Sequence, residues 1–214
     1  MTMMLLVRND YDPITHYMFC WSEPLCEAAE RRSITPRLVD GPEATRSNIL
    51  SRIRKLAPRF ICLNGHGDRS SFACSEGRER IDEKDAPVFQ RTVVFARACD
   101  CVVNLGAAAA ENGCEAFIGY EREFMNVRQL DLLTKPLADE VSRPIWEASN
   151  AVALGLLKGK TVGEAMQAAH DKTDQRILDL VYSDHPAAET VLKALLMNDE
   201  GLTYAGSSGA SIAS

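Results

Sequence analysis

Short apolar runs alternate with helix-like segments over roughly the first 120 residues of the chain. Five segments have the length and composition of strands: the largely apolar runs 3–7, 60–63, 92–96 and 116–118, and the mixed segment 34–39. Three segments between or after them are helix-like: 22–32, 42–57 and 107–111. Strands and helices that alternate in this way predict a mostly parallel sheet covered by helices on both faces.

The last third of the chain has helical periodicity only. Apolar residues recur every three or four positions from Leu137 to Leu156, and Pro144 is expected to break or restart that helix. Thr161 and Glu164 form a capping-box pattern ahead of a second helix, and Pro186 suits the start of a third. The sequence therefore predicts an α/β three-layer sandwich with a helical C-terminal third.

Two stretches are predicted to lack regular structure. Residues 65–90 are polar, contain glycine and are dense in charge, which is typical of a long functional or mobile loop with at most a short helical turn. Residues 204–214 are mostly Ser, Gly and Ala and are expected to form a disordered tail. We therefore expect a single domain over residues 1–203.

Composition narrows the function classes. The chain has 214 residues, 46% hydrophobic and 25% charged, which is ordinary for a globular domain. Thirty acidic against 24 basic residues give a net charge of −6, which argues against non-specific nucleic-acid binding. No apolar stretch approaches the length of a membrane span, so no membrane partner is expected.

The compartment is predicted from the N-terminal segment and the cysteines. Met1 to Val7 is apolar but has no basic leader and no small-residue cleavage site, so we interpret it as a first strand rather than a signal peptide. Seven cysteines are an odd number, and free thiols are expected in a reducing cytoplasm.

The most informative pairing lies at the ends of two predicted strands. His66, between two glycines, follows the apolar run 60–63, and Cys99 follows the run 92–96 after Arg97 and Ala98. Sites in open parallel sheets form beyond the carboxyl ends of the strands. Two strands that end at the same edge would place the imidazole beside the thiol, an arrangement that activates a cysteine nucleophile.

The residues around this pair suit the same chemistry. Gly65 and Gly67 allow a sharp turn and a close approach of backbone to substrate. The N–H groups of Gly67 and Cys99 are the natural pair to hold a developing oxyanion. A lone histidine or cysteine at a strand end is usually structural, but the two together in this frame leave catalysis and a structural role both open. Cys101 offers a second thiol, and a disulfide between it and Cys99 would be strained.

These motifs carry a resemblance to a known family. An apolar strand, His-Gly, a variable loop, a second apolar strand and Ala-Cys resemble the caspase-like (clan CD) cysteine peptidases. Residues 105–120 and 163–169 are similar to a helix–strand unit and a late helix of the bacterial gingipain and CHAT-type branches. The resemblance covers roughly residues 58–172. It implies a caspase-hemoglobinase fold, and the Ala-Cys match favours Cys99 over Cys101 as the nucleophile.

The resemblance also implies a mechanism and partners. It makes Cys99 the nucleophile and His66 the general base of an endopeptidase that works through a thioacyl-enzyme, without a metal or other cofactor. The substrate would be a protein or peptide, and a regulatory protein partner is expected. Bacterial relatives often work in signalling or defence systems.

The substrate pocket leaves alternatives open. In several family members the residue two before the nucleophile lines the pocket, and here that residue is Arg97, which would favour an acidic side chain. Other members place an acid just after the first strand, where Asp10 and Asp12 stand, and prefer Arg or Lys. Glu121 lies in a loop that could also reach the pocket.

Other functions have weaker signals. A non-catalytic binding or scaffold module that keeps the fold is the main alternative, and a flavodoxin-like ligand-binding domain is a further one. His16, Cys20 and Cys26 fit no zinc pattern well, so no metal site is predicted. The chain has neither a G-x-G-x-x-G motif nor a P-loop, so nothing in it indicates nucleotide binding.

Overall fold

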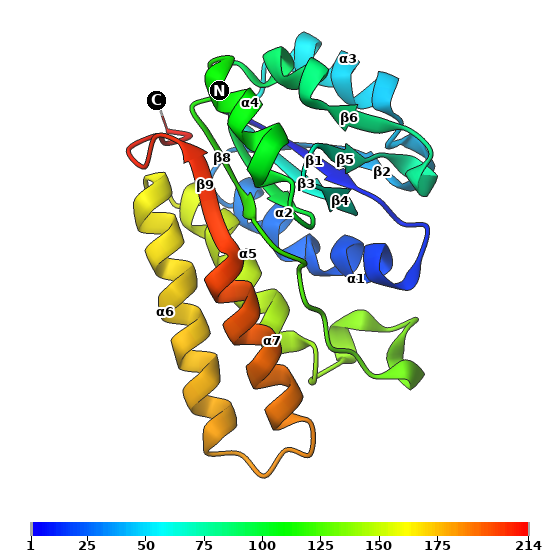
Figure 1. The fold of residues 1–214 in the computed structure, drawn as a ribbon, viewed down its shortest axis with the longest axis vertical. Helices are drawn as coiled ribbons and strands as arrows, with labels where there is room; N and C mark the ends of the chain where they lie inside the picture. The colour runs from blue at the N-terminus through cyan, green and yellow to red at the C-terminus, as the bar shows by residue number, and fades with distance from the viewer. Residues whose placement is uncertain (1, 214) are drawn as a thin grey trace.

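A six-stranded sheet forms the centre of the molecule in a computed structural model that describes residues 2–213 (Figure 1). Its strands run in the order β2-β1-β3-β7-β8-β9. Their bounds are β1 Met3–Arg8, β2 Thr35–Asp40, β3 Phe60–Asn64, β7 Val93–Arg97, β8 Ala116–Tyr120 and β9 Leu202–Gly206. The first five pair in parallel and β9 is antiparallel to β8, which confirms the predicted mostly parallel sheet.

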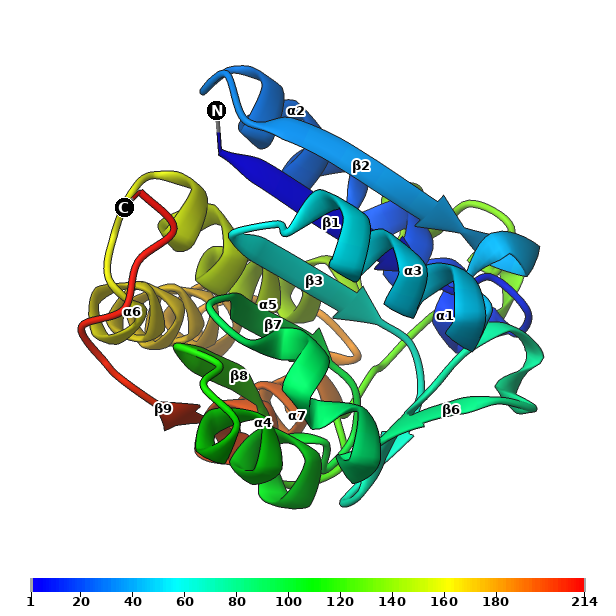
Figure 2. The same ribbon diagram turned by 90° about the horizontal axis from the view of Figure 1, so that it is seen from above.

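Helices cover both faces of this sheet, as expected for a three-layer sandwich (Figures 1 and 2). One face carries α1 Pro13–Trp21, α2 Glu23–Glu30, α5 Arg143–Leu157, α6 Val162–Val181 and α7 Ala188–Gly201, and the other carries α3 Arg46–Leu56 and α4 Ala107–Glu111. Side chains alternate along each strand, so Cys62 packs toward the first layer while Ile61 and Leu63 pack toward the second. This alternation divides the apolar interior into two cores of buried side chains, one on each side of the sheet.

Short helical turns connect these elements. They are 3₁₀ turns at Gly41–Glu43, Ser75–Gly77, Glu83–Phe89, Leu130–Leu132 and Pro136–Ala138, and a π-helical turn at Val102–Gly106. Pro144 lies in the first turn of α5, where a proline needs no partner for its missing N–H. The capping box of Thr161 and Glu164 opens α6 as predicted. Within residues 2–213 no helix is long and apolar enough to cross a bilayer.

The prediction of a long loop over residues 65–90 is wrong. This stretch forms a second, antiparallel sheet of three short strands, β4 Gly67–Asp68, β5 Ser71–Ala73 and β6 Arg80–Asp82. Phe72 and Ile81 are register partners and both are fully buried against the second core. Strands of two or three residues are too short to show a periodicity in sequence, and the many charges around them hid the two apolar anchors.

The expectation of a disordered tail over residues 204–214 is wrong for residues 204–213, while Ser214 lies outside the described residues. Residues 202–206 form β9 on the free edge of β8. The Ser207 N–H donates to the Glu115 carbonyl at 2.8 Å, and the side chain of Ile212 is buried. Small residues suit this path because a Cβ at Gly206 would lie 2.6 Å from the Glu115 carbonyl oxygen.

Candidate functional site

The sheet brings His66 and Cys99 to the same edge. In the parallel pairing of β3 with β7, Asn64 is the register partner of Arg97. The ladder continues one step further, because the Gly65 N–H donates to the Arg97 carbonyl at 3.3 Å. His66 and Cys99 each stand two residues beyond the last register pair. Both therefore lie at the carboxyl edge of neighbouring strands, as predicted.

Both glycines beside His66 are required because other atoms of the protein lie too close for a side chain at either position. A Cβ at Gly65 would lie 2.3 Å from Nδ2 of Asn9, whose buried amide donates to the Ala73 carbonyl. A Cβ at Gly67 would lie 2.3 Å from Sγ of Cys101 and 2.9 Å from the carbonyl oxygen of Cys99. The backbone at Gly67 is thus packed directly against that of Cys99, which any other residue would prevent.

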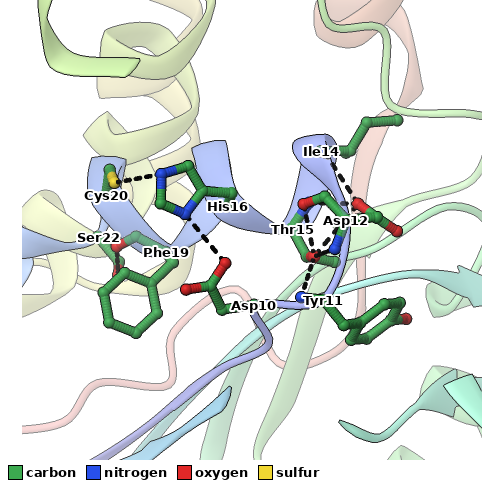
Figure 3. A network of polar contacts seen from close by, with 9 residues as sticks. All are labelled: Asp10, Tyr11, Asp12, Ile14, Thr15, His16, Phe19, Cys20 and Ser22. Carbon is green, nitrogen blue, oxygen red and sulfur yellow. Dashed lines mark hydrogen bonds and ion pairs between the residues drawn. The ribbon is translucent and has the colours of Figure 1, made fainter. Parts of the chain in front are cut away.

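Helix α1 supplies a carboxylate to the imidazole. Oδ2 of Asp12 lies 2.6 Å from Nε2 of His66. The other oxygen, Oδ1, caps α1 by accepting the N–H groups of Ile14 and Thr15 at 2.9 and 2.8 Å (Figure 3). Thr15 in turn accepts the Asp12 N–H and completes a capping box. One carboxylate therefore fixes both the start of the helix and the ring of His66.

This pairing keeps the carboxylate charged and leaves half of the imidazole open. Burial alone would raise the pKa of Asp12, but the Thr15 N–H and the His66 ring lower it below its usual value. Nδ1 of His66 makes no hydrogen bond within residues 2–213, and the side chain is 37% exposed. His66 thus has one nitrogen held by the protein and one available for proton transfer.

Cys99 is a half-buried thiol on a tight turn. The residue after it, Asp100, has a φ of +55°, a left-handed conformation that turns the chain away from the strand. The Phe124 N–H points at Sγ from 3.4 Å. Burial raises the pKa of the thiol, and Glu123 and Asp100 raise it further, whereas the Phe124 N–H lowers it. No hydrogen bond joins Cys99 to His66 among the described residues.

The second thiol of the Cys-Asp-Cys sequence has a different place. Cys101 is fully buried, and its thiol donates to the Ser71 carbonyl at 3.2 Å. Burial raises the pKa of Cys101 strongly. Cys101 therefore joins the backbone after β7 to the small sheet and has no access to a substrate.

Arg97 is not a surface or pocket residue. Its side chain is fully buried on the α5 side of the sheet, where it stacks on Trp146 with 5.4 Å from Cζ to the ring centroid. Its guanidinium donates to Asn64, Ser149 and Asn150, all of which are neutral. Burial lowers the pKa of this arginine. The expectation that Arg97 lines a substrate pocket was wrong. Helix α5 covers the end of β7, and its Ser149 and Asn150 accept hydrogen bonds from the Arg97 guanidinium.

The other pocket candidates remain near the surface. Oδ1 of Asp10 lies 2.9 Å from Nδ1 of His16 (Figure 3). A cavity of about 440 Å³ is lined by Asp10, Tyr11, Asp12, Pro13, His16, Leu133 and Thr134. Glu121 is exposed at the end of β8, beside the sheet edge. Among residues 2–213 no three His, Cys, Asp or Glu side chains are grouped as a metal site.

The role of Asp12 was missed from the sequence. Asp12 was considered only as an acid for a substrate side chain, whereas its carboxylate contacts His66. A local signal was present, since Asp-Pro followed by Thr at the third helical position is a helix start. That signal predicts α1, but the contact with His66 depends on how α1 lies against β3.

Of three comparisons with known proteins, only the one with solved structures found a similar protein. No protein-family model matches the chain, and no curated protein sequence is similar to it. Among solved structures, it is similar to the complex of the pro- and mature domains of RgpB, a gingipain from Porphyromonas gingivalis, with a TM-score of 0.60 and 11% identity. The match covers 98% of this chain and 48% of that one, so this chain spans about half the neighbour's length. The likeness shows a caspase-like fold.

Proposed function

We propose that this protein is a cysteine endopeptidase in which Cys99 is the nucleophile and His66 the general base. The observation that carries the proposal is the parallel register of β3 and β7, which ends one strand next to His66 and the other next to Cys99. The caspase-like fold of the structural neighbour supports the same assignment.

The proposed reaction has two steps. Sγ of Cys99 attacks the carbonyl carbon of the scissile peptide bond while His66 takes the thiol proton through Nδ1. The N–H groups of Gly67 and Cys99 stabilise the oxyanion, the C–N bond breaks, and His66 returns the proton to the leaving amine. A water molecule then attacks the thioester carbonyl as His66 takes one of its protons. The C–S bond breaks, the new carboxyl end is released, and His66 returns the proton to Sγ of Cys99.

Asp12 would be the positioning residue of this reaction. Its contact with Nε2 at 2.6 Å fixes the plane of the ring and stabilises the imidazolium that forms when Cys99 is deprotonated. Because the pKa of Cys99 is raised, the thiol needs His66 as a base to take its proton during the attack.

For the substrate we propose a preference for Arg or Lys before the scissile bond. With Arg97 buried and Asp12 held by His66, the remaining candidates Asp10 and Glu121 are both acidic, and Asp10 lines a cavity next to Asp12. We also propose that the protein acts on a protein substrate in the cytoplasm under the control of a partner protein.

Cleavage of a peptide library tests this function, with Cys99→Ala and His66→Ala as the paired controls. We expect cleavage by the unaltered protein to disappear in both variants. Cys101→Ala should keep its cleavage, since that thiol has no access to a substrate. Unchanged cleavage in Cys99→Ala would overturn the assignment.

The second candidate is a binding or scaffold module in which the pair is inactive. The absence of a hydrogen bond between His66 and Cys99 favours it. Alkylation of Cys99 near neutral pH separates the two. A peptidase predicts fast labelling that slows when His66 is replaced, whereas a scaffold predicts labelling that is slow with or without His66.

A further inference from the structure

A second cysteine and histidine lie on α1, and an aspartate from the loop before this helix contacts the histidine. Nε2 of His16 lies 3.8 Å from Sγ of Cys20, one helical turn further on, and Nδ1 of the same ring lies 2.9 Å from Oδ1 of Asp10. Figure 3 shows the imidazole between the carboxylate and the sulfur. A nucleophile in contact with a base that is itself oriented by a third group is the general arrangement of an activated side chain.

This arrangement is accessible, in contrast to most thiols of the protein. Five cysteines are buried: Cys26, Cys62, Cys74, Cys101 and Cys114. Cys20 and Cys99 are the two that are partly exposed. The side chains of His16 and Asp10 are 33% and 36% exposed, so reagents reach the base as well as the thiol.

The charges around Cys20 are mainly negative. Burial raises the pKa of the thiol, Asp10 and Glu23 raise it further, and Arg8 lowers it. Arg8 is itself paired with Glu23 and Asp40, so its charge is neutralised locally. A protonated thiol in such surroundings needs a base to react, and His16 is the base in contact with it. The same surroundings attract a cationic reagent and repel an anionic one.

We propose that Cys20, His16 and Asp10 form a thiol-exchange site that takes small neutral or cationic disulfides and stores one half as a mixed disulfide on Cys20. Asp10 and His16 also line the cavity proposed for the substrate side chain, but the nucleophile here is Cys20, and the exchange does not require that the protein be a peptidase.

The exchange step is balanced by the disulfide itself. Sγ of Cys20 attacks one sulfur of the small disulfide as His16 takes the thiol proton. The new Cys20 S–S bond forms, the original S–S bond breaks, and the other half leaves as a thiolate that takes the proton from His16. Cys20 is oxidised and the released half is reduced, so no further oxidant is needed.

The test measures the rate of mixed-disulfide formation at Cys20 with bis(2-hydroxyethyl) disulfide, a neutral probe, by peptide mass spectrometry. The background is the Cys99→Ala protein, so the result does not depend on peptidase activity. We expect His16→Gln to slow the reaction by about tenfold or more, as loss of a general base does. An unchanged rate in His16→Gln would overturn the proposal.

Asp10→Ala separates positioning from charge. Removal of a carboxylate that raises the pKa of Cys20 would by itself speed the reaction. Loss of the group that orients His16 slows it, and we expect the slower rate. A faster rate would show that His16 needs no orientation and would contradict the site as drawn.

Probe charge and folding are controlled in the same samples. Cystamine, which is cationic, should react faster than the anionic reagent 5,5′-dithiobis(2-nitrobenzoate) after correction for their rates with free cysteine. The reverse order would contradict the proposed ligand class. The five buried cysteines report folding, because a variant that unfolds exposes them all. If His16→Gln exposes these cysteines, His16→Asn replaces it as the test variant, and we expect the same slowing of mixed-disulfide formation at Cys20.

Discussion

The molecule holds two groups of cysteine, histidine and aspartate, and they are assembled in opposite ways. Cys99 and His66 lie just beyond the ends of β7 and β3, Asp12 lies at the start of α1, and tertiary structure alone brings these elements together. Cys20, His16 and Asp10 lie within eleven residues of sequence. One turn of α1 joins His16 to Cys20, and Asp10 lies in the loop just before the helix.

The difference lies in what holds each imidazole. At the sheet edge the histidine is bound by a carboxylate that also caps a helix. The glycines around it are packed against the side chains of Asn9 and Cys101 and the carbonyl of Cys99. On α1 both partners of the ring are surface side chains. We therefore expect the first group to be sensitive to changes in the surrounding fold and the second to be sensitive only to changes in its own members.

The largest effect is expected from Arg97→Leu, which removes the buried cation under the sheet edge. Two amide oxygens, on Asn64 and Asn150, lose their donor. We expect the free energy of unfolding to fall by about 3 kcal/mol, since each buried acceptor without a partner costs ~1–3 kcal/mol. Urea denaturation measures it. Arg122→Gln, at an exposed arginine, is the matched control, and equal stability of the two variants would contradict the structural role.

A smaller loss is expected for Gly67→Ala, which forces the backbone of His66 away from Cys99. The added methyl group collides with Sγ of Cys101 and the Cys99 carbonyl. Overpacking of this kind lowers the free energy of unfolding by about 2 kcal/mol. The alkylation rate of Cys99 should also change, while that of Cys20 should not. Gly163→Ala is the control, because its nearest atoms lie at ordinary distances of 3.5 and 3.6 Å. A changed alkylation rate of Cys20 in Gly67→Ala would contradict the independence of the two groups.

Asp12→Ala should cost about 1 kcal/mol at neutral pH, the usual loss for a helix N-cap. Asn also caps helices, so Asp12→Asn should lose less and report the charge alone. The pKa of Asp12 is lowered on folding, so its charge stabilises the protein above the unfolded pKa of about 4. That contribution disappears as the pH falls through the lowered value. Urea midpoints at neutral and acidic pH measure it, and a difference between wild type and Asp12→Asn that persists in acid would contradict this account.

The smallest effect on stability is expected from His16→Gln, within about 0.5 kcal/mol, because the side chain lies on the surface of α1. The Cys99 alkylation rate should also stay unchanged. A thermal denaturation curve and the labelling of both thiols test this. A large loss of stability would show that the second group supports the fold and is not a local feature.

The sequence predicted the positions of the central strands well because each is a continuous apolar run. Strands β3 and β7 both have this pattern, so the edge with His66 and Cys99 could be located from the sequence. The short strands β5 and β6 could not, since only Phe72 and Ile81 carry the burial. Strand β9 was hidden by its small residues, whose value lies in their fit against the backbone at Glu115.

The roles of the charged residues were harder to predict than their positions. Arg97 and Asp12 both stand near strand ends, and both were expected to face a substrate. Their actual partners lie far along the chain, Ser149 and Asn150 on α5 for the first and His66 for the second. The sequence around a residue does not identify partners that lie far along the chain. Only the packing of α5 and α1 against the sheet decides them.

The antiparallel strand β9 has a consequence for how the chain is made. Its partner β8 is synthesised long before it, and the helices α5, α6 and α7 lie between the two. On the ribosome, the outer backbone groups of β8 therefore have no strand to pair with until this last segment has emerged. A nascent chain with such an open edge is a template for pairing with other chains. Slow or interrupted translation after α7 would thus be the stage at which this protein most needs a chaperone.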